Sequence, residues 1–199
     1  MAVELYNATG SPPCTFVRVV AKKVGVELKL HNINLMAKEQ LNPEFVKLNP
    51  QHTVPTLNDN GFVLWESRAI GMYLVEKYAP ESSLYPKDVQ KRATVNRMLF
   101  FESGTMLPAQ MAYFRPKWFK GQEPSADLKE AFDKALATTV TLLGEQQGSE
   151  YEGLDKFPQL KEYYQRFKKA LPEYDEVATE SLQRIRDMVA RAKSGKSPH

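Results

Sequence analysis

The sequence lacks the features that mark secreted, membrane-spanning or nucleic-acid-binding proteins. Its 199 residues contain one cysteine, so no internal disulfide can form and a reducing compartment, the cytoplasm, is expected. No apolar run approaches the length of about 20 residues that a membrane span needs, and no signal-peptide pattern opens the chain. The net charge of +3 is too small to indicate a nucleic-acid partner, and the basic stretch at 184–199 fits a solvated helix end.

The first 80 residues contain both strand and helix patterns. Val3 and Leu5 alternate with polar residues, which predicts a strand, and from Pro12 the apolar spacing becomes that of a helix ended by Gly25. Residues 26–30 alternate again. Because the helix between these strands is long enough for a crossover, we expect the two strands to pair in parallel.

A hairpin and a helix complete this first unit. A short helix from Pro43 precedes two strand patterns at 54–57 and 62–65, which flank an Asp-Asn-Gly turn and predict an antiparallel hairpin. Ser67 then caps a helix that Pro80 ends.

The remaining chain shows no strand pattern. Prolines and serines at 81–87 indicate a linker. Helical spacing follows in four segments, 89–114, 126–143, 157–170 and 178–192. We therefore expect an α/β domain at 1–80, a linker at 81–87 and an all-α domain at 88–199.

The stretch GSPPC at residues 10–14 is the first candidate for chemistry. Gly10 allows a tight turn, and Ser11 stands at the N-cap of a helix whose first turn holds two prolines. The spare N–H groups there favour an anion, although on this stretch alone the favoured interpretation is that Ser11 is simply a cap. Cys14 lies one turn inside the helix, where a buried core residue is expected rather than a nucleophile.

A second cluster lies around the hairpin. If the Val54–Pro55 bond were cis, Val54 would turn its backbone outward, where it could pair with an extended peptide ligand. Glu66 and Ser67 open a helix whose N–H groups suit a carboxylate. Each feature alone is weak, but their order and spacing together are specific.

The stretches LYNATGSPPCTFVRVVAKKVGVEL, NPEFVKLNPQHTVPTLNDNGFVLWESRAIGMYLVEKY and FFESGTMLPAQMAYFRP carry a family resemblance. In them the chain resembles the glutathione transferases, most closely the insect delta and epsilon classes. The resemblance covers residues 1 to about 145 closely and the rest more loosely. It implies a thioredoxin-like N-terminal domain followed by a helical C-terminal domain.

The resemblance also implies roles for single residues. Ser11 is then the catalytic residue, whose hydroxyl donates a hydrogen bond to the glutathione sulfur. The glutathione-binding positions are Gln40, His52, Thr53, Val54, Pro55, Glu66, Ser67 and Arg68, with Pro55 cis, Glu66 and Ser67 at the γ-glutamyl end, and Gln40 and His52 at the glycine end. The pocket for the hydrophobic substrate is lined by Leu107, Met111, Tyr113, Phe114 and Trp118.

Some of these assignments have alternatives or depart from the family pattern. His52 is by its sequence alone an exposed loop histidine. Gln40 stands where delta-class members usually have a histidine, so we expect a weaker grip on the glycine carboxylate. The aromatic residues of the pocket have helical spacing, which is more often typical of a core.

The implied function is conjugation of glutathione, as co-substrate, to small hydrophobic electrophiles in detoxification. The implied state is a cytoplasmic homodimer, with Arg68 near the dimer face and no metal. The alternatives are a transferase-like protein that binds glutathione or apolar ligands without efficient turnover, an interaction module, and Cys14 in the role of nucleophile. The position of Cys14 argues against the last of these.

The chain departs from the family where residues 147–154 pass almost directly into the segment that begins at Phe157. There about two dozen residues are missing by resemblance, the length of a helix with its Ser/Thr-x-x-Asp capping box. We expect the helical domain to lack one core helix, which would expose apolar faces at 140–143 and 157–170.

Overall fold

The computed structural model describes residues 2–143 and 158–193. By their contacts the residues form two units, the first made of 1–92 and 173–185 and the second of 93–172 and 186–198. The predicted deletion falls at 144–157, outside the described residues, as do the side chains of Val140 and Leu143.

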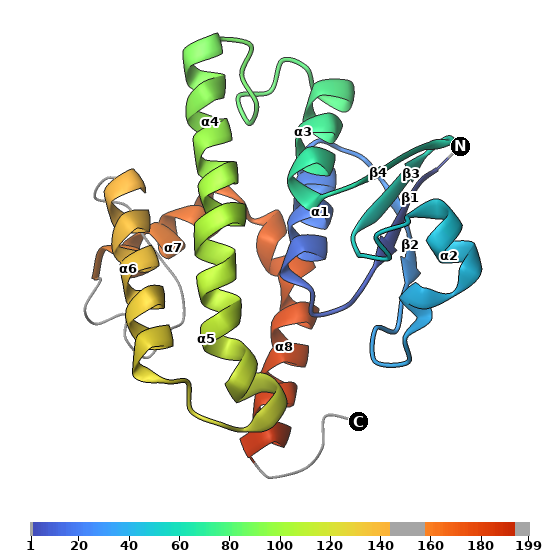
Figure 1. The fold of residues 1–199 in the computed structure, drawn as a ribbon. Coiled ribbons are helices and arrows are strands. Elements are labelled where there is room, and N and C mark those ends of the chain that lie inside the picture. The colour runs from blue at the N-terminus through green and yellow to red at the C-terminus, as the bar shows by residue number, and fades with distance from the viewer. Residues whose placement is uncertain (1, 144–157, 194–199) are drawn as a thin grey trace. The chain divides into compact units, whose positions relative to one another are not determined.

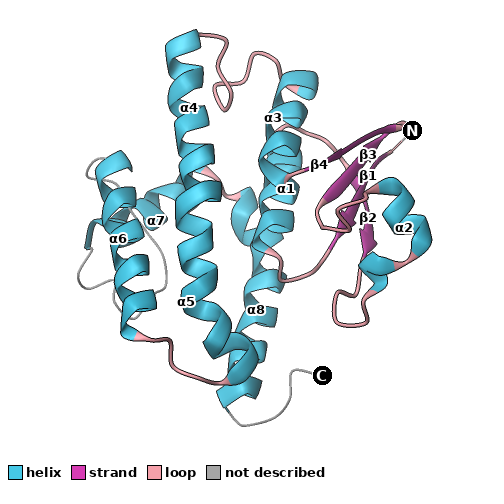
Figure 2. Cartoon of the chain, viewed as in Figure 1, coloured by secondary structure: helices cyan, strands magenta, loops and turns pink. Residues whose placement is uncertain are grey.

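A four-stranded sheet in the order β2–β1–β3–β4 forms the centre of the first unit (Figure 2). The strands are β1 (Val3–Asn7), β2 (Leu28–Asn32), β3 (Thr56–Asp59) and β4 (Phe62–Trp65). The first two are parallel and the other neighbours antiparallel, as the sequence predicts.

Two strands begin two residues later than predicted. The N–H of Val26 donates to the carbonyl of Ala21 at 2.8 Å, so this residue still belongs to the exit of the preceding helix. Pro55 has no N–H to offer a ladder, and β3 therefore begins at Thr56.

Helices α1 (Pro12–Lys23) and α3 (Ser67–Tyr78) cover one face of the sheet (Figure 1). The core between them consists of fully buried side chains, chiefly Leu5, Val17, Leu57, Ile70 and Leu74. The short 3₁₀-helix η1 (Glu39–Leu41) and helix α2 (Pro43–Leu48) belong to the other face, where the ring of Phe45 meets that of Tyr6 at 5.4 Å. Neighbouring residues of β1 thus face opposite sides, as the period of a strand requires.

The hairpin turn has the predicted residues and geometry. Asn60 and Gly61 form the two-residue loop, with φ of +55° and +95°. Positive φ at both positions is what a type I′ turn needs, and its twist matches that of the strands. The Asn58 side chain accepts the N–H of Gly61 at 2.9 Å and closes the turn.

Helix α8 (Glu173–Lys193) begins five residues before the predicted segment. Its first turn holds Glu173, Asp175 and Glu176. These polar residues break the apolar spacing, but their charges suit the positive end of a helix dipole. Residues 173–185 of α8 belong to the first unit.

The second unit contains α5 (Leu107–Lys120), α6 (Ala126–Leu143), α7 (Pro158–Ala170) and most of α4 (Val89–Phe101). Its core is a cluster of Tyr113, Phe132 and Leu136. The sequence predicts one helix over 89–114, but a π-helical turn at Glu102–Met106 divides it. Pro108 lacks the N–H that would bond one turn back, and a wider turn before it relieves the clash.

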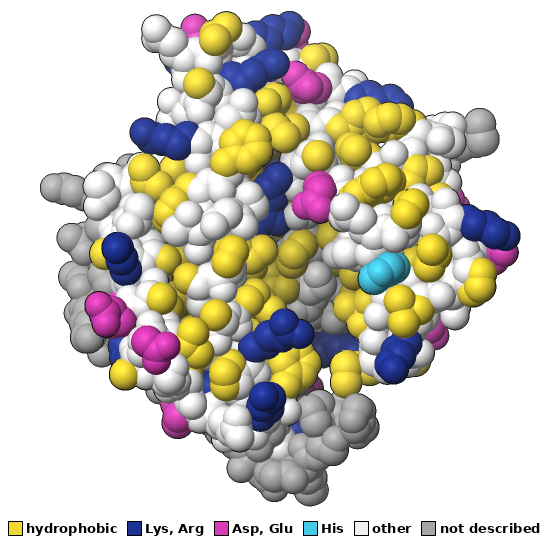
Figure 3. Space-filling view, in the orientation of Figure 1, with side chains coloured by type: hydrophobic (Ala, Val, Ile, Leu, Met, Phe, Trp, Pro, Cys, Tyr) yellow, Lys and Arg dark blue, Asp and Glu magenta, His cyan; other side chains and the backbone are white. Residues whose placement is uncertain are grey.

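The surface shows no concentration of one charge on the face drawn in Figure 3, where basic, acidic and apolar side chains are interspersed. Among the described helices, none combines the length and the apolar character needed to cross a membrane.

Candidate functional site

Three of the predicted motifs lie at one end of the sheet. Tyr6, near the end of β1, pairs with Thr56 at the start of β3, and Thr56 pairs with Trp65 at the end of β4. The register therefore brings together the turn after β1, the Val54–Pro55 segment before β3 and the Glu66–Ser67 segment after β4.

The turn after β1 ends in a serine cap. Gly10 has a φ of +88°, which suits glycine. Ser11 is extended, with φ −82° and ψ 116°, and its Oγ accepts the N–H of Cys14 at 3.4 Å. Ser11 is thus the N-cap of α1, as predicted.

Capping does not exhaust the Ser11 hydroxyl. A hydroxyl accepts with two lone pairs and donates one proton, and the cap uses only a lone pair. The proton can therefore be donated to an anion at the N-terminus of α1, where the partial positive charge of the helix favours one. The two interpretations of Ser11 left open by the sequence are therefore compatible.

Cys14 is fully buried, which confirms its predicted place in the core. Its Sγ accepts the N–H of Ala8 at 3.4 Å. Burial raises the pKa of the Cys14 thiol, and hydrogen bonds from Ser11 and Ala8 only partly oppose that rise. A thiol is a weak acceptor, so it competes poorly with an anion for the Ser11 proton.

The Val54–Pro55 peptide bond is cis, as the resemblance implies. The loop before it is built on Asn49, a fully buried side chain that sequence reasoning missed. The Asn49 amide donates to the Thr53 carbonyl at 3.1 Å and to Thr56 Oγ1 at 2.9 Å. The Asn-Pro pair at 49–50 was the signal for a turn start that could have revealed it.

The third motif differs in detail from the prediction. Ser67 is the first residue of α3 rather than its cap, and the cap position belongs to Glu66, with φ +68°. Sequence patterns place helix ends only to within a residue or two. The Arg68 guanidinium donates to Ser67 Oγ at 2.5 Å and lies 5.1 Å from the centre of the Phe16 ring.

The two residues predicted for the glycine end lie in loops of the same unit. His52 is exposed, with a left-handed φ of +45°. Gln40 belongs to η1, and its Oε1 is buried with no hydrogen-bond partner among the described residues. Such an atom is one that a ligand could satisfy.

The predicted pocket residues all belong to α5. Tyr113 is buried in the core, stacked on Phe132 at 5.2 Å, and Phe114 stacks on Trp118 at 5.1 Å. Leu107 and Met111 are half-buried.

A surface hollow of about 470 Å³ on α5 has a different lining among the described residues, namely Ala112, Arg115, Pro116, Phe119 and Lys120. The role of the five residues in a pocket stays a prediction.

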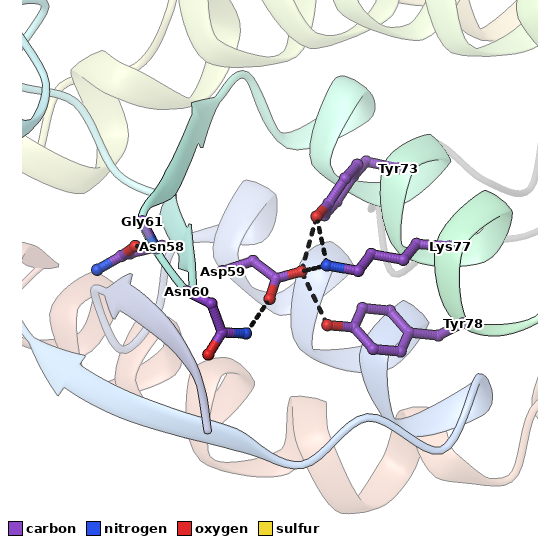
Figure 4. Close-up of polar contacts among 7 residues, drawn as sticks. All are labelled: Asn58, Asp59, Asn60, Gly61, Tyr73, Lys77 and Tyr78. Carbon is purple, nitrogen blue, oxygen red and sulfur yellow. Dashed lines mark hydrogen bonds and ion pairs between the residues drawn. The ribbon is translucent and has the colours of Figure 1, made fainter. Parts of the chain in front are cut away.

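A buried carboxylate anchors the hairpin to α3 at the other end of β3 (Figure 4). Asp59 accepts hydrogen bonds from Tyr73 at 2.7 Å, Lys77 at 2.7 Å and Tyr78 at 2.8 Å. Burial alone would raise the pKa of the Asp59 carboxyl, but these bonds and one from Asn60 outweigh it and hold that pKa well below its usual range. The cluster holds the fold and lies away from the three motifs.

The described residues contain no group of three His, Cys, Asp or Glu side chains that could hold a metal ion. The three motifs bring two helix N-termini and the cis Val54–Pro55 bond to one end of the sheet, and helix N-termini favour anions.

Comparisons with known proteins agree with this geometry. Residues 1–76 match the glutathione S-transferase N-terminal domain. Glutathione S-transferase D6 of Drosophila melanogaster is 40% identical, over 87% of this chain and 91% of that protein. Glutathione S-transferase D7 of the same organism is 50% identical over 65% of this chain and 60% of that protein.

A solved structure gives the same result. The delta-class glutathione transferase of Nilaparvata lugens is 36% identical, with a TM-score of 0.87, over 96% of this chain and 99% of that one. The alignment with transferase D6 spans 195 positions but takes in 87% of the 199 residues here, about 173, so roughly 22 positions have no residue in this chain. That length agrees with the predicted deletion. From the fold, the three motifs and these relatives together, the chain belongs to the glutathione S-transferase family, in the insect delta and epsilon group.

Proposed function

We propose that this chain conjugates reduced glutathione to small hydrophobic electrophiles, and that the Ser11 hydroxyl stabilises the glutathione sulfur as a thiolate. The observation that carries the proposal is the cap itself. Ser11 Oγ accepts an N–H at the start of α1, and an anion at that helix end is a stronger acceptor for its proton than the neutral Cys14 thiol.

The energies are of the right size. A thiol with a pKa of about 8.5 is only a few per cent ionised at neutral pH, and the thiolate is the nucleophile. Lowering that pKa by about two units requires about 2.7 kcal/mol of preference for the anion. One hydrogen bond to a charged group supplies about 1.5–3 kcal/mol, and the helix end adds to it. Ser11 therefore need not act as a base.

The rest of the tripeptide is held by backbone and helix ends. The cysteinyl backbone of glutathione pairs with Val54, before the cis proline, in the manner of an added strand. The γ-glutamyl carboxylate lies at the N-terminus of α3, at Glu66 and Ser67 with Arg68 beside them. Gln40 and His52 hold the glycine end, and Thr53 is a further glutathione-binding position.

We further place the protein in the cytoplasm as a homodimer, with no nucleic-acid or membrane partner. Support for the compartment comes from the single cysteine, which is buried and leaves no pair for a disulfide, as suits a reducing compartment.

A second candidate is a protein that binds glutathione without efficient turnover. The core helix that is missing by resemblance favours it, because the helical domain supplies the proposed electrophile pocket, and so does Gln40 in place of the usual histidine. The intact Ser11, Val54–Pro55 and Glu66–Ser67 motifs favour the enzyme.

The test is conjugation of glutathione to a chlorodinitrobenzene electrophile by wild type and Ser11→Ala, with glutathione binding titrated separately. Wild-type turnover that falls about 10- to 100-fold in the variant, with binding retained, supports the serine mechanism. Turnover that survives in Ser11→Ala contradicts it. Binding without wild-type turnover supports the second candidate.

A further inference from the structure

Helix α8 runs along α1 in the opposite direction, and its residues 181 and 184 contact the first turn of α1 and Gly10 (Figure 1). In order along α8, the contacts join Glu173 to Lys23, Glu176 to Lys22, Ser181 to Thr15 and Arg184 to Gly10. As the residue number rises on α8 it falls on α1. Residues 173–185 therefore form a strut from the C-terminus of α1 to its N-terminus, within the first unit.

Within this segment, Ser181 makes the hydrogen bonds to Gly10 and Thr15. It is only 4% exposed, and its Oγ accepts the N–H of Gly10 at 3.4 Å. Its hydroxyl also lies 3.0 Å from Thr15 Oγ1, which lies 3.1 Å from the carbonyl oxygen of Ser11.

The protons of this network can be assigned. A carbonyl only accepts, so the Thr15 hydroxyl donates its single proton to the Ser11 carbonyl. Thr15 Oγ1 then accepts from Ser181, whose own oxygen accepts from Gly10. The three bonds form a chain that holds the main chain on both sides of the Gly10–Ser11 peptide.

Arg184 lies three residues after Ser181 on α8, and its side chain packs against Gly10. A Cβ atom at Gly10 would lie 3.2 Å from Cδ of Arg184. The aliphatic part of this side chain thus covers the glycine, whose φ of +88° few other residues adopt.

We propose that Ser181 is a positioning residue for the thiolate-stabilising hydroxyl of Ser11, acting through Gly10 and Thr15; this rests on the proposed function. Hydrogen bonds weaken steeply with angle and distance, so the Ser11 hydroxyl must stay aligned with the sulfur. Without the Ser181 hydroxyl, the Gly10 N–H loses its partner and the turn relaxes.

Catalysis and binding should therefore separate. The proposed contacts to the peptide of glutathione come from Val54, Glu66 and Ser67, which the Ser181 network does not touch. Loss of Ser181 lowers the share of thiolate while leaving the glutathione KM almost as it was. A purely structural role would instead lower stability and raise KM together.

The test measures the pH midpoint of bound glutathione thiolate, by its ultraviolet absorbance, together with kcat and KM in the full chain. The variants are Ser181→Ala and Thr15→Val, which removes the hydroxyl but keeps the shape of the side chain. Thr15→Ser restores the hydroxyl and should move the midpoint back toward wild type. The matched control is Thr179→Ala, an exposed residue of α8 whose hydroxyl bonds the Asp175 carbonyl of its own helix.

Ser181→Ala and Thr15→Val are each expected to raise the midpoint by about 0.5–1 unit and to lower kcat about 3- to 10-fold, with KM within about twofold. The double variant should show less than the sum of the two shifts, since both break one network. Thr179→Ala should match wild type. If Ser181→Ala does not fold, the proposal is tested by comparing the pH midpoint of bound glutathione in Thr15→Val with that in Thr15→Ser.

The outcomes distinguish this inference from the function on which it rests. If Ser11→Ala raises the midpoint while Ser181→Ala and Thr15→Val do not, the positioning role is overturned and the serine mechanism stands. A raised KM with an unchanged midpoint also overturns it. If Ser11→Ala leaves the midpoint unchanged, both proposals fail.

Discussion

Ser11 and Cys14 lie within one helical turn of each other and yet have opposite surroundings. Ser11 is half-buried at the N-terminus of α1, where an anion is favoured. Cys14 is fully buried, and burial raises the pKa of its thiol, so it stays protonated at neutral pH. At the scale of single residues, it is therefore access to a ligand that makes Ser11 the candidate catalytic residue, although the thiol of Cys14 is the intrinsically more reactive group.

Replacing Cys14 by alanine is expected to leave kcat/KM for conjugation within about twofold of wild type. The free energy of unfolding should fall by about 1 kcal/mol, as for the loss of one buried methyl-sized group. Iodoacetamide should label the native protein slowly below about pH 9, because the thiolate is scarce there. A loss of conjugation as large as that of Ser11→Ala would identify Cys14 as the nucleophile instead.

At the scale of elements, the hairpin and α3 are joined by one carboxylate. The Asp59 side chain is fully buried, while its partner Lys77 is 43% exposed. The Lys77 pKa is raised by its bonds to Asp59 and Tyr73. The anion therefore has three donors from α3, and neutralising it leaves them with a weaker acceptor.

Asp59→Asn is expected to lower the free energy of unfolding at pH 7 by about 1–3 kcal/mol. Because the Asp59 pKa is depressed in the folded state, its contribution is full above the unfolded value of about 3.9 and is lost as pH falls below it. Urea unfolding at pH 7 and pH 3 measures this. The difference between wild type and variant should narrow at pH 3.

The control for Asp59→Asn is Glu44→Gln, which breaks an exposed pair with Lys47 within α2. Exposed pairs of this kind contribute little, so a change below about 0.5 kcal/mol is expected. Equal effects of the two variants, or a difference that does not depend on pH, would contradict the role assigned to Asp59.

The packing of α1 on α3 depends on Gly71. A Cβ there would lie 2.7 Å from Cε1 of Phe16, the ring that also carries the Arg68 guanidinium. Gly71→Ala is therefore expected to destabilise the protein by about 1–3 kcal/mol, measured by urea unfolding.

The matched variant is Gly104→Ala in the π-helical turn, where a Cβ meets nothing within 4 Å. There the lost flexibility of the unfolded chain should stabilise the protein by about 0.5–1 kcal/mol. Opposite signs at the two glycines are the expected result. The same sign at both would mean that Phe16 yields easily.

At the scale of the whole molecule, local patterns predicted most elements. Strands β1 and β4, the Asn60–Gly61 turn and α6 follow from alternation, turn residues and helical spacing. The motifs around Ser11, Pro55 and Glu66 were predicted from their order along the chain. Their gathering at one sheet end follows from the strand register, which the predicted parallel pair and hairpin already imply.

What could not be predicted depends on contacts between distant residues. Asn49 with Thr56, Asp59 with Tyr73, and Ser181 with Thr15 are polar pairs whose partners only the fold brings together. The start of α8 was missed because an acidic turn satisfies a helix dipole without apolar spacing.

In the proposal, the first unit binds glutathione and the helical unit supplies the electrophile pocket. This leads to a prediction on thermal stability. Glutathione at about 100 times its dissociation constant should stabilise the folded chain by about 2.7 kcal/mol, a Tm rise of about 5–10 °C for a protein of this size. Ser11→Ala should keep most of that rise, because the proposed peptide contacts are at Val54 and Glu66–Ser67. S-methylglutathione, which cannot ionise at sulfur, serves as control and should stabilise wild type and variant equally.

Thermal melts with and without ligand measure this beside the conjugation rate. A Tm rise with robust turnover means that the helical unit completes an electrophile pocket despite the shortened chain. The same rise with no turnover means that the glutathione site of the first unit survives without an enzyme. No rise at saturating glutathione would contradict both, because every proposed contact to the tripeptide lies in residues that the first unit alone holds in place.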